Sequence, residues 1–159
     1  MVYGVWLASG LVYVEQTAQA QRRLRDLPVG ESHHLASTFP PEIWARVVVI
    51  AWPRLPGAAS GLEVDAQTVG LALEHRLQAE LRPMANHWTR TPAGGWRELQ
   101  WQRSTSRGAL AAGEAIEALF EQVLRSWVTA ADACPELAVA DVAPGCRVVL
   151  PGKLLRSGH

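Results

Sequence analysis

Apolar residues fill most of the first fifteen positions and leave neither face of an extended chain polar. Strand-forming residues stand on both sides of Ala8-Ser9-Gly10, which supplies turn chemistry. The pattern predicts a β-hairpin, and a hairpin with two apolar faces has to be covered twice. We expect a central place in a sheet. The alternative cover is a second protein chain, which makes Tyr3, Trp6 and Tyr13 candidate residues of an oligomer interface.

Three later segments have clear hydrophobic patterns. The continuous β-branched run Arg46–Trp52 predicts a strand that is buried on both faces. Apolar residues at a spacing of four predict a helix that reaches Arg82, with Asp65 as its N-cap. A wide apolar stripe predicts one long helix over Gly108–Ala131, with Glu121 and Arg125 as an ion pair on its polar side.

The remaining patterns are weaker. Gln16–Leu27 is expected to form a polar helix, and Pro28–Pro41 a loop. Short strands are expected at Leu137–Ala140 and Arg147–Leu150, on either side of the turn residues Pro144-Gly145. The last nine residues are expected to be a flexible tail.

The segment Asn86–Arg107 concentrates aromatic and cationic side chains. Its 22 residues hold three of the seven tryptophans and four of the fourteen arginines. We predict a β-hairpin in which Thr91 pairs with Trp96, Trp88 with Leu99 and Asn86 with Trp101, around a Pro92–Gly95 turn. One face would then carry Trp88, Leu99, Trp101, Arg90, Arg97 and Arg103. The solvated face would carry His87, Thr89, Thr91, Trp96, Glu98, Gln100 and Gln102.

Three roles are open to this hairpin. The first is structural: Trp88, Leu99 and Trp101 pack beneath the Gly108–Ala131 helix while the arginine head groups reach water. The second is a protein interface, because Trp and Arg are enriched at binding hot spots. The third is a stacking platform for single-stranded nucleic acid. The residues to test under the second and third roles are Trp88, Arg90, Trp96, Arg97, Trp101 and Arg103.

The charge composition restricts the classes of partner. Fifteen basic and fifteen acidic residues give a formal net charge of zero, which argues against a strong non-specific DNA-binding protein. A local Arg/Trp patch could still contact nucleic acid. Fourteen arginines against the single Lys153 fit a GC-rich bacterial genome, and selection for the planar guanidinium gives the same bias. The sequence does not separate these two causes.

Membrane and secretory signals are missing from the pattern. The apolar stretch at the start is shorter than the roughly 20 residues of a membrane span and lacks a basic leader region. Cys134 and Cys146 have neither metal nor redox spacing, and whether they pair is left open. We therefore expect a soluble cytoplasmic protein with no membrane contact.

Catalytic and cofactor chemistry finds little support. His33 and His34 are adjacent, so in an extended segment they point apart, and a metal site would need distant ligands such as His75, His87 or Glu31. We expect no metal. Neither cysteine has the surroundings of a nucleophile. Glu63, Asp65 and Glu98 are better explained by capping and solvation than by a nuclease site, and the glycine-containing stretches match no nucleotide-binding motif. We expect no cofactor.

These patterns predict one α+β domain over residues 1–150, in the order ββ-α-β-α-ββ-α-ββ. We expect a mixed or mainly antiparallel sheet built from the opening hairpin, the Arg46–Trp52 strand and the tryptophan hairpin, with the helices packed on one face. The function we expect is that of a small non-catalytic accessory protein acting through protein contacts, as an oligomer or a subunit of a larger bacterial or mobile-element complex. The alternatives are a module that contacts single-stranded nucleic acid or RNA through residues 86–107, and a metal-dependent hydrolase using His33, His34 or His87.

Overall fold

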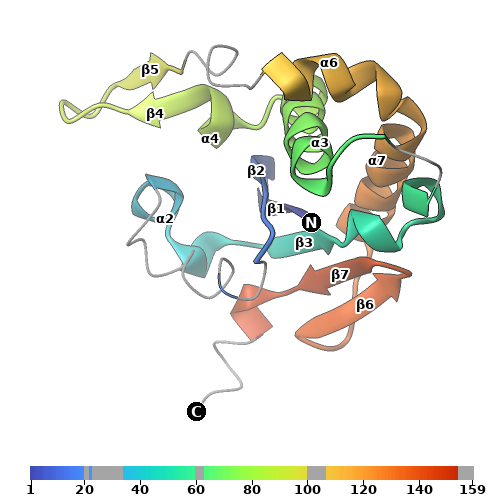
Figure 1. Ribbon diagram of the computed structural model, residues 1–159. Helices are drawn as coiled ribbons and strands as arrows, with labels where there is room; N and C mark the ends of the chain where they lie inside the picture. Colours follow the sequence, from blue (N-terminus) through green and yellow to red (C-terminus); the bar gives the residue numbers. More distant parts are fainter. Residues whose placement is uncertain (20–21, 23–33, 60–62, 100–106, 154–159) are drawn as a thin grey trace.

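The computed structural model describes residues 1–19, 22, 34–59, 63–99 and 107–153 (Figure 1). Within these residues the main sheet has five antiparallel strands in the order β2-β1-β3-β7-β6. Their bounds are β1 Val2–Leu7, β2 Gly10–Gln16, β3 Arg46–Ile50, β6 Val139–Ala143 and β7 Cys146–Val149. Two further strands, β4 Trp88–Arg90 and β5 Trp96–Glu98, form a sheet of their own. The chain is α+β, and its strands and helices follow the predicted order.

The long helices lie on one face of the main sheet (Figure 1). They are α3 Ala66–Leu81, α6 Arg107–Ala115 and α7 Glu117–Asp132. Shorter segments are α2 His34–Thr38, α4 Met84–His87, and the 3-10 turns η2 Pro41–Ile43, η3 Trp52–Arg54 and η4 Pro56–Ala59. As predicted, Asp65 caps α3, because its carboxylate accepts a hydrogen bond from Thr68 N at 3.0 Å. None of the helices in the described residues is both long and apolar enough to span a membrane.

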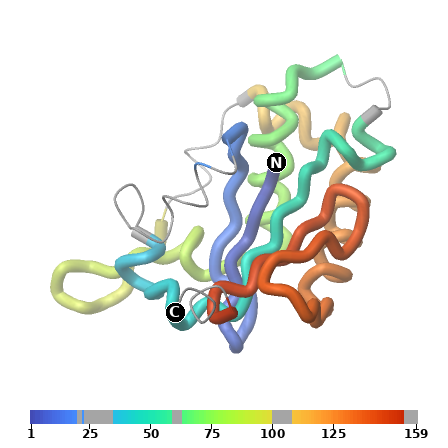
Figure 2. Tube along the Cα trace, turned by 90° about the horizontal axis from the view of Figure 1, so that it is seen from below, coloured from blue at the N-terminus to red at the C-terminus, as the bar shows by residue number. Residues whose placement is uncertain are grey.

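The sheet separates two apolar cores. Val2, Val14 and Val48 face the long helices and pack in one core with side chains of α3, α6 and α7. The alternate residues of the same strands form the second core on the opposite face. Its buried members include Tyr3, Val5, Leu35, Trp44 and Ala85. Both faces of the opening hairpin are therefore covered by the chain itself, and Figure 2 shows the strands running side by side.

Gly4 lets α7 approach the sheet closely. It lies in β1 opposite Val14, on the side of the long helices. A Cβ at this position would overlap Trp127 Cζ2 and would lie 3.0 Å from Leu11 Cδ1. The Trp127 ring thus occupies the space that a side chain would take, and it packs against Trp6 with 5.4 Å between ring centroids.

Polar side chains of α3 and α4 cover the free edge of the sheet at β2. Asn86 Oδ1 accepts from Val14 N at 2.7 Å, and Asn86 Nδ2 donates to Val14 O at 2.8 Å. Gln78 Nε2 also donates to Val14 O, and Gln16 N donates to the Glu74 carboxylate. Asn86 thus takes the place of a neighbouring strand at this residue, which blocks one position for pairing with another chain.

The main sheet differs from the predicted one in its fourth and fifth strands. The tryptophan hairpin is separate, because β3 pairs with β1 on one side and with β7 on the other. The predicted single helix over Gly108–Ala131 is interrupted at Ile116, whose φ of −100° and ψ of 12° separate α6 from α7. The Glu121–Arg125 pair is present at 3.6 Å.

Two expectations concern residues between β2 and β3. The predicted loop Pro28–Pro41 contains the short helix α2, in which Leu35 is fully buried in the second core. Burial of that residue, rather than helix propensity, explains why a short helix forms here. The predicted helix Gln16–Leu27 does not begin where expected, because Gln16 ends β2 and residues 17–19 are not helical. Of its remaining residues the structure describes Arg22 alone.

Candidate interaction surface

The strands β4 and β5 and their turn, residues 88–98, form an arm that we call the ribbon. Its base is joined to the rest of the molecule by hydrogen bonds around α4. Leu99 N donates to His87 O at 2.6 Å, and the His87 ring lies 3.1 Å from Gln78 O. Next to His87, Asn86 binds Val14 of the main sheet. The ribbon therefore leaves the molecule from a fixed base, as Figure 1 shows beside α4.

The tip of the ribbon is a hydrogen-bonded turn. Thr91 N donates to Gly95 O at 2.9 Å, and Gly94 N donates to Thr91 O at 2.9 Å. Gly95 N also donates to Thr91 Oγ1 at 3.1 Å. Gly94 has φ +83°, a conformation that glycine adopts without the cost other residues meet. The predicted turn position is confirmed.

The register of the ribbon differs by one residue from the predicted register. Trp88 pairs with Glu98, Thr89 with Arg97 and Arg90 with Trp96. A shift of one position moves a whole set of side chains to the other face. Trp88, Arg90, Trp96 and Glu98 therefore share one face, which we call the tryptophan face, and Arg97 lies on the opposite face with Thr89. The predicted grouping of Trp88 with Arg97 and Leu99 is wrong.

All four residues of the tryptophan face are exposed to solvent. Trp88 is 40% exposed and Trp96 44% exposed. Trp96 stacks on Phe39, with 6.4 Å between ring centroids and 24° between ring planes. The expectation that Trp88 packs beneath the Gly108–Ala131 helix is wrong, because Trp88 is exposed and is not part of the core to which α6 and α7 contribute.

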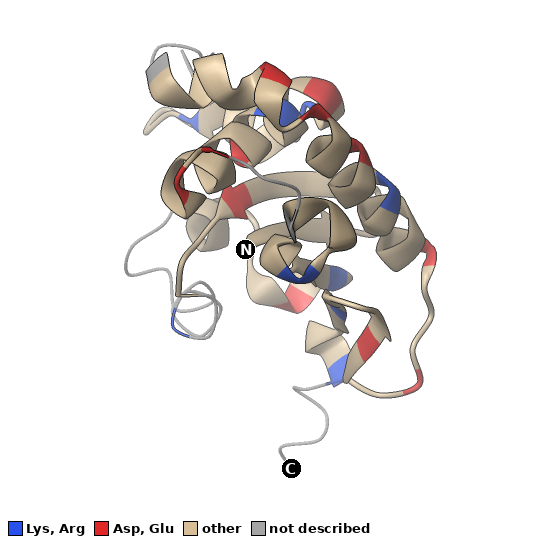
Figure 3. Cartoon of the chain, turned by 45° about the vertical axis from the view of Figure 1, so that its right-hand side comes forward, with Lys and Arg blue, Asp and Glu red and all other residues tan. Residues whose placement is uncertain are grey.

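The charges on the tryptophan face cancel. Arg90 contributes one positive charge and Glu98 one negative charge, while Arg97 lies on the other face. Figure 3 likewise shows acidic and basic residues interspersed along the helices. A continuous positive groove is what binding to nucleic-acid backbones requires.

Several predicted site residues lie elsewhere. Tyr3 and Tyr13 are buried at 0% and 4% exposure in the second core, and Trp6 is half-buried against Trp127. Their burial within this chain leaves little of them for an oligomer interface. Trp101 and Arg103 lie outside the described residues.

The histidines do not form a metal site in the part of the chain that is described. His34 begins α2, and His87, expected on a solvated face, is buried beside Gln78 O. Burial lowers the pKa of His75. No cluster of three or more His, Cys, Asp or Glu side chains suited to a metal ion occurs among the described residues. His33 and Glu31 lie outside them.

The cysteines do not pair with each other: Cys134 is exposed, while Cys146 is buried and its thiol donates towards Ser126 O. Burial raises the pKa of Cys146, followed by the effect of the Asp141 charge, so its thiol stays protonated at neutral pH. A protonated, buried thiol is a core residue and not a nucleophile.

Sequence reasoning missed Phe39 and Asn86 as residues that position the ribbon. Phe39 stands just before Pro40-Pro41. An aromatic residue next to two prolines is the feature of the sequence that could have pointed to its role. Asn86 was assigned to a strand, and nothing in the local pattern indicates a partner 72 residues away.

No protein-family model, no curated protein and no solved structure matches this chain.

Proposed function

We propose that this chain is a small accessory protein that binds another protein through the tryptophan face of the ribbon. The observation that carries the proposal is the pair Trp88 and Trp96, exposed together on one face of an arm with a fixed base. Exposed tryptophans with a neighbouring arginine are the composition of binding hot spots. Arg90 supplies that neighbour.

The charge of this face favours a protein partner over nucleic acid. Arg90 and Glu98 cancel, so the face offers no net attraction for phosphates. A protein partner needs an apolar recess for the indole rings, with polar groups at its rim for Arg90 and Glu98. We take such a partner, of near-neutral charge at the contact, as the occupant of this surface.

The tryptophan face is too small to form a stable interface by itself, so we expect it to act as an anchor within a larger interface or in a transient contact. At about 40% exposure, the two indole rings offer on the order of 150 Å² together. A stable interface buries about 800 Å² on each partner. Met84 in α4, just before β4, and Ile43 in η2, four residues beyond Phe39, are further exposed apolar side chains. This area is small for a stable dimer formed by the ribbon alone.

The experiment compares the double variant Trp88→Ala/Trp96→Ala with the matched control Leu137→Ala, which removes an apolar side chain that is 69% exposed far from the ribbon. Tagged proteins are used to recover partners from the native host, and the recovered partner is then purified for direct titration. We expect the partner to bind the wild-type protein and Leu137→Ala, and to be lost with the double variant.

Two further readings complete the test. The affinity of an apolar protein contact should change little between low and moderate salt, whereas nucleic-acid binding should fall steeply. Solution mass over a concentration series shows whether the chain pairs with itself. Equal binding by the double variant overturns the proposal. So does steep salt dependence with a single-stranded oligonucleotide as the ligand, or self-association through the tryptophan face with no other partner.

A further inference from the structure

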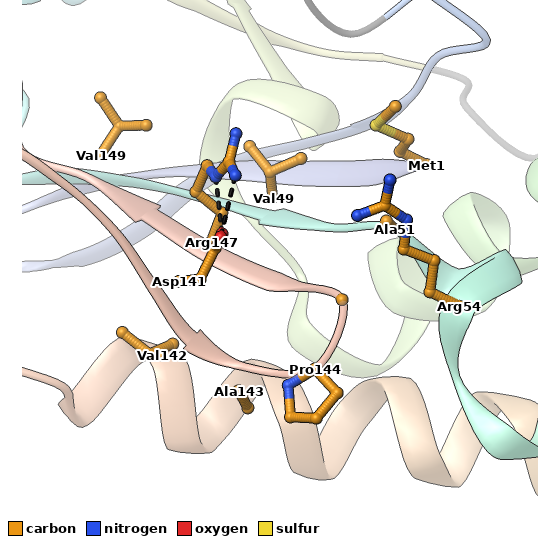
Figure 4. Close-up of a pocket in the computed structure, with 11 residues that line it drawn as sticks. Met1, Val49, Ala51, Arg54, Asp141, Val142, Ala143, Pro144, Arg147 and Val149 are labelled. Carbon is orange, nitrogen blue, oxygen red and sulfur yellow. Dashed lines mark hydrogen bonds and ion pairs between the residues drawn. The ribbon is translucent and has the colours of Figure 1, made fainter.

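A pocket of about 570 Å³ lies on the face of the main sheet opposite the long helices, away from the ribbon (Figure 4). Its base is apolar and is made by Val49 and Ala51 at the end of β3 and by Val149 in β7. The turn between β6 and β7 forms one wall. This volume falls in the range of about 300–1,000 Å³ that is typical of small-molecule sites.

The wall of the pocket is held in place by backbone contacts. Ala51 N donates to Gly145 O at 2.7 Å, which ties the turn to the end of β3. Gly145 has φ +71°, and a Cβ there would lie 3.2 Å from Ala51 O. The turn and η3 are thus in close contact, and the pocket is formed before any ligand arrives.

Three charged side chains line the pocket. Arg147 donates to Asp141 through Nε at 2.7 Å and Nη2 at 2.9 Å, so these two charges neutralise each other. Arg54 is exposed, and its guanidinium has no hydrogen bond or ion pair with any described residue. Figure 4 places Arg54 and Arg147 on opposite sides of Val49. The three side chains leave one uncompensated positive charge beside an apolar base.

The charge of Arg54 acts across the pocket. The pKa of Asp141 is lowered chiefly by its hydrogen bond from Arg147, and the charge of Arg54 contributes to the same effect. The pair with Asp141 uses Nε and Nη2 of Arg147 and leaves Nη1 free. An anion placed between the two guanidinium groups would therefore contact Arg54 on one side and Arg147 Nη1 on the other. A bidentate guanidinium geometry suits a carboxylate.

We propose that this pocket binds a small organic monoanion, with a carboxylate at Arg54 and an apolar body on Val49, Ala51 and Val149. Arg54 is the one uncompensated charge among the lining side chains and sets the charge of the ligand, while the ammonium of the lining residue Met1 donates to Thr17 O. The valine base sets the apolar part of the ligand. A polyanion such as a nucleotide triphosphate does not match, because Asp141 would repel the additional charge. None of the lining residues belongs to the ribbon, so this site stands independently of the proposed protein contact.

The test titrates octanoate into the full-length protein and follows backbone amide shifts by NMR. Octanol, of the same length without charge, and octylammonium, with the opposite charge, are the ligand controls. We expect octanoate to shift the amides of Ala51, Gly145, Arg147 and Val149 and to leave the ribbon unchanged. Octanol should bind at least about 10-fold more weakly, because it lacks the charge-assisted hydrogen bond.

Two variants are expected to change the affinity for octanoate in opposite directions. Arg54→Gln should weaken octanoate binding about 10-fold or more. Asp141→Asn should strengthen it, because the substitution releases Arg147 and removes a negative charge. The matched control Arg125→Gln, an exposed arginine on α7, should bind as the wild type does.

Several results overturn the proposal. They are the absence of shifts at the pocket at millimolar octanoate, equal binding of octanol, and unchanged affinity in Arg54→Gln. Shifts that map to the ribbon instead of the pocket also overturn it. Loss of protein partners in the ribbon variants has no bearing on these readouts, so the two proposals fail separately.

Discussion

Replacing Gly4 with alanine is a direct test of how α7 packs on the main sheet. Gly4 adopts an ordinary strand conformation, so an alanine meets no backbone strain there. Its Cβ would overlap Trp127 Cζ2 and would lie 3.0 Å from Leu11 Cδ1 and from Trp6 Cζ3. Trp127 is 2% exposed and surrounded by core residues, so its ring has little room to move.

The expected cost follows from two opposing effects. Overpacking a core costs about 1–3 kcal/mol. Loss of glycine flexibility in the unfolded chain offsets about 0.4–1 kcal/mol of this. The net destabilisation is therefore about 1–2 kcal/mol. At about 2–4 °C for each kcal/mol in a chain of this length, Tm should fall by roughly 2–8 °C.

The matched control is Gly113→Ala in α6. A Cβ there would lie 3.9 Å from Arg76 Cδ, an ordinary contact. Alanine stabilises a helix interior relative to glycine by about 0.5–1 kcal/mol, so the same chemical change should raise Tm. The opposite sign separates crowding at Gly4 from a general effect of adding a methyl group.

A double-mutant cycle with Trp127→Phe identifies the partner in the contact. Phenylalanine lacks the Cζ2 atom of the indole, so the cost of Gly4→Ala should fall by at least about 0.5 kcal/mol in that background. Thermal unfolding by circular dichroism and urea titration supply the free energies. An unchanged or raised Tm for Gly4→Ala, or an equal cost in both backgrounds, would refute the close packing of Trp127 on β1.

Two further predictions concern polar groups that hold elements in place. Asn86→Asp replaces the amide donor to Val14 O with a carboxylate oxygen, and we expect a loss of about 1–3 kcal/mol in urea unfolding, against no change for the exposed Gln67→Ala. An unaltered midpoint for Asn86→Asp would contradict the role of Asn86 at the sheet edge. Asp65→Ala should lower Tm by removing the cap of α3, whereas Asp65→Asn, which retains a capping side chain, should lower it less. Hydrogen bonds from Thr68 lower the pKa of Asp65 in the folded state, so its contribution is complete above the unfolded value of about 3.9 and is lost as pH falls through the folded value. The Tm difference between wild type and Asp65→Ala should therefore be constant near neutral pH and should narrow below about pH 4; a constant difference at all pH values would contradict this account.

Local patterns predicted the elements of the fold but not their tertiary partners. The β-branched run at Arg46 and the Asp65 cap are properties of neighbouring residues, and both predictions are confirmed. The neighbour of β3 depends on which strand reaches its free edge, and β7 takes that edge although it lies about 100 residues downstream. No periodicity in either segment encodes that choice.

The ribbon shows how a small local error changes a functional interpretation. The turn was located correctly, yet the pairing slipped by one residue, because Thr91 with Gly95 closes the turn where Thr91 with Trp96 was expected. This slip brings Glu98 and Trp96 to the face of Trp88 and removes Arg97. The predicted cationic face becomes a neutral aromatic face, and the balance between nucleic acid and protein as partner changes with it.

Both proposed binding sites lie on the same side of the main sheet. The reason is that long helices cover one face of the sheet and short segments cover the other. The long helices fill one face with a continuous core, and their exposed sides carry interspersed charges. The opposite face is covered at β1 and β2 by short segments such as α2 and α4, to which the ribbon is joined through Phe39 and His87. Among the described residues no such segment covers the same face beside Val149, and the pocket with Arg54 lies there. The helices thus fill one face completely, and the other face, with its small covering segments and open apolar base, carries both proposed sites.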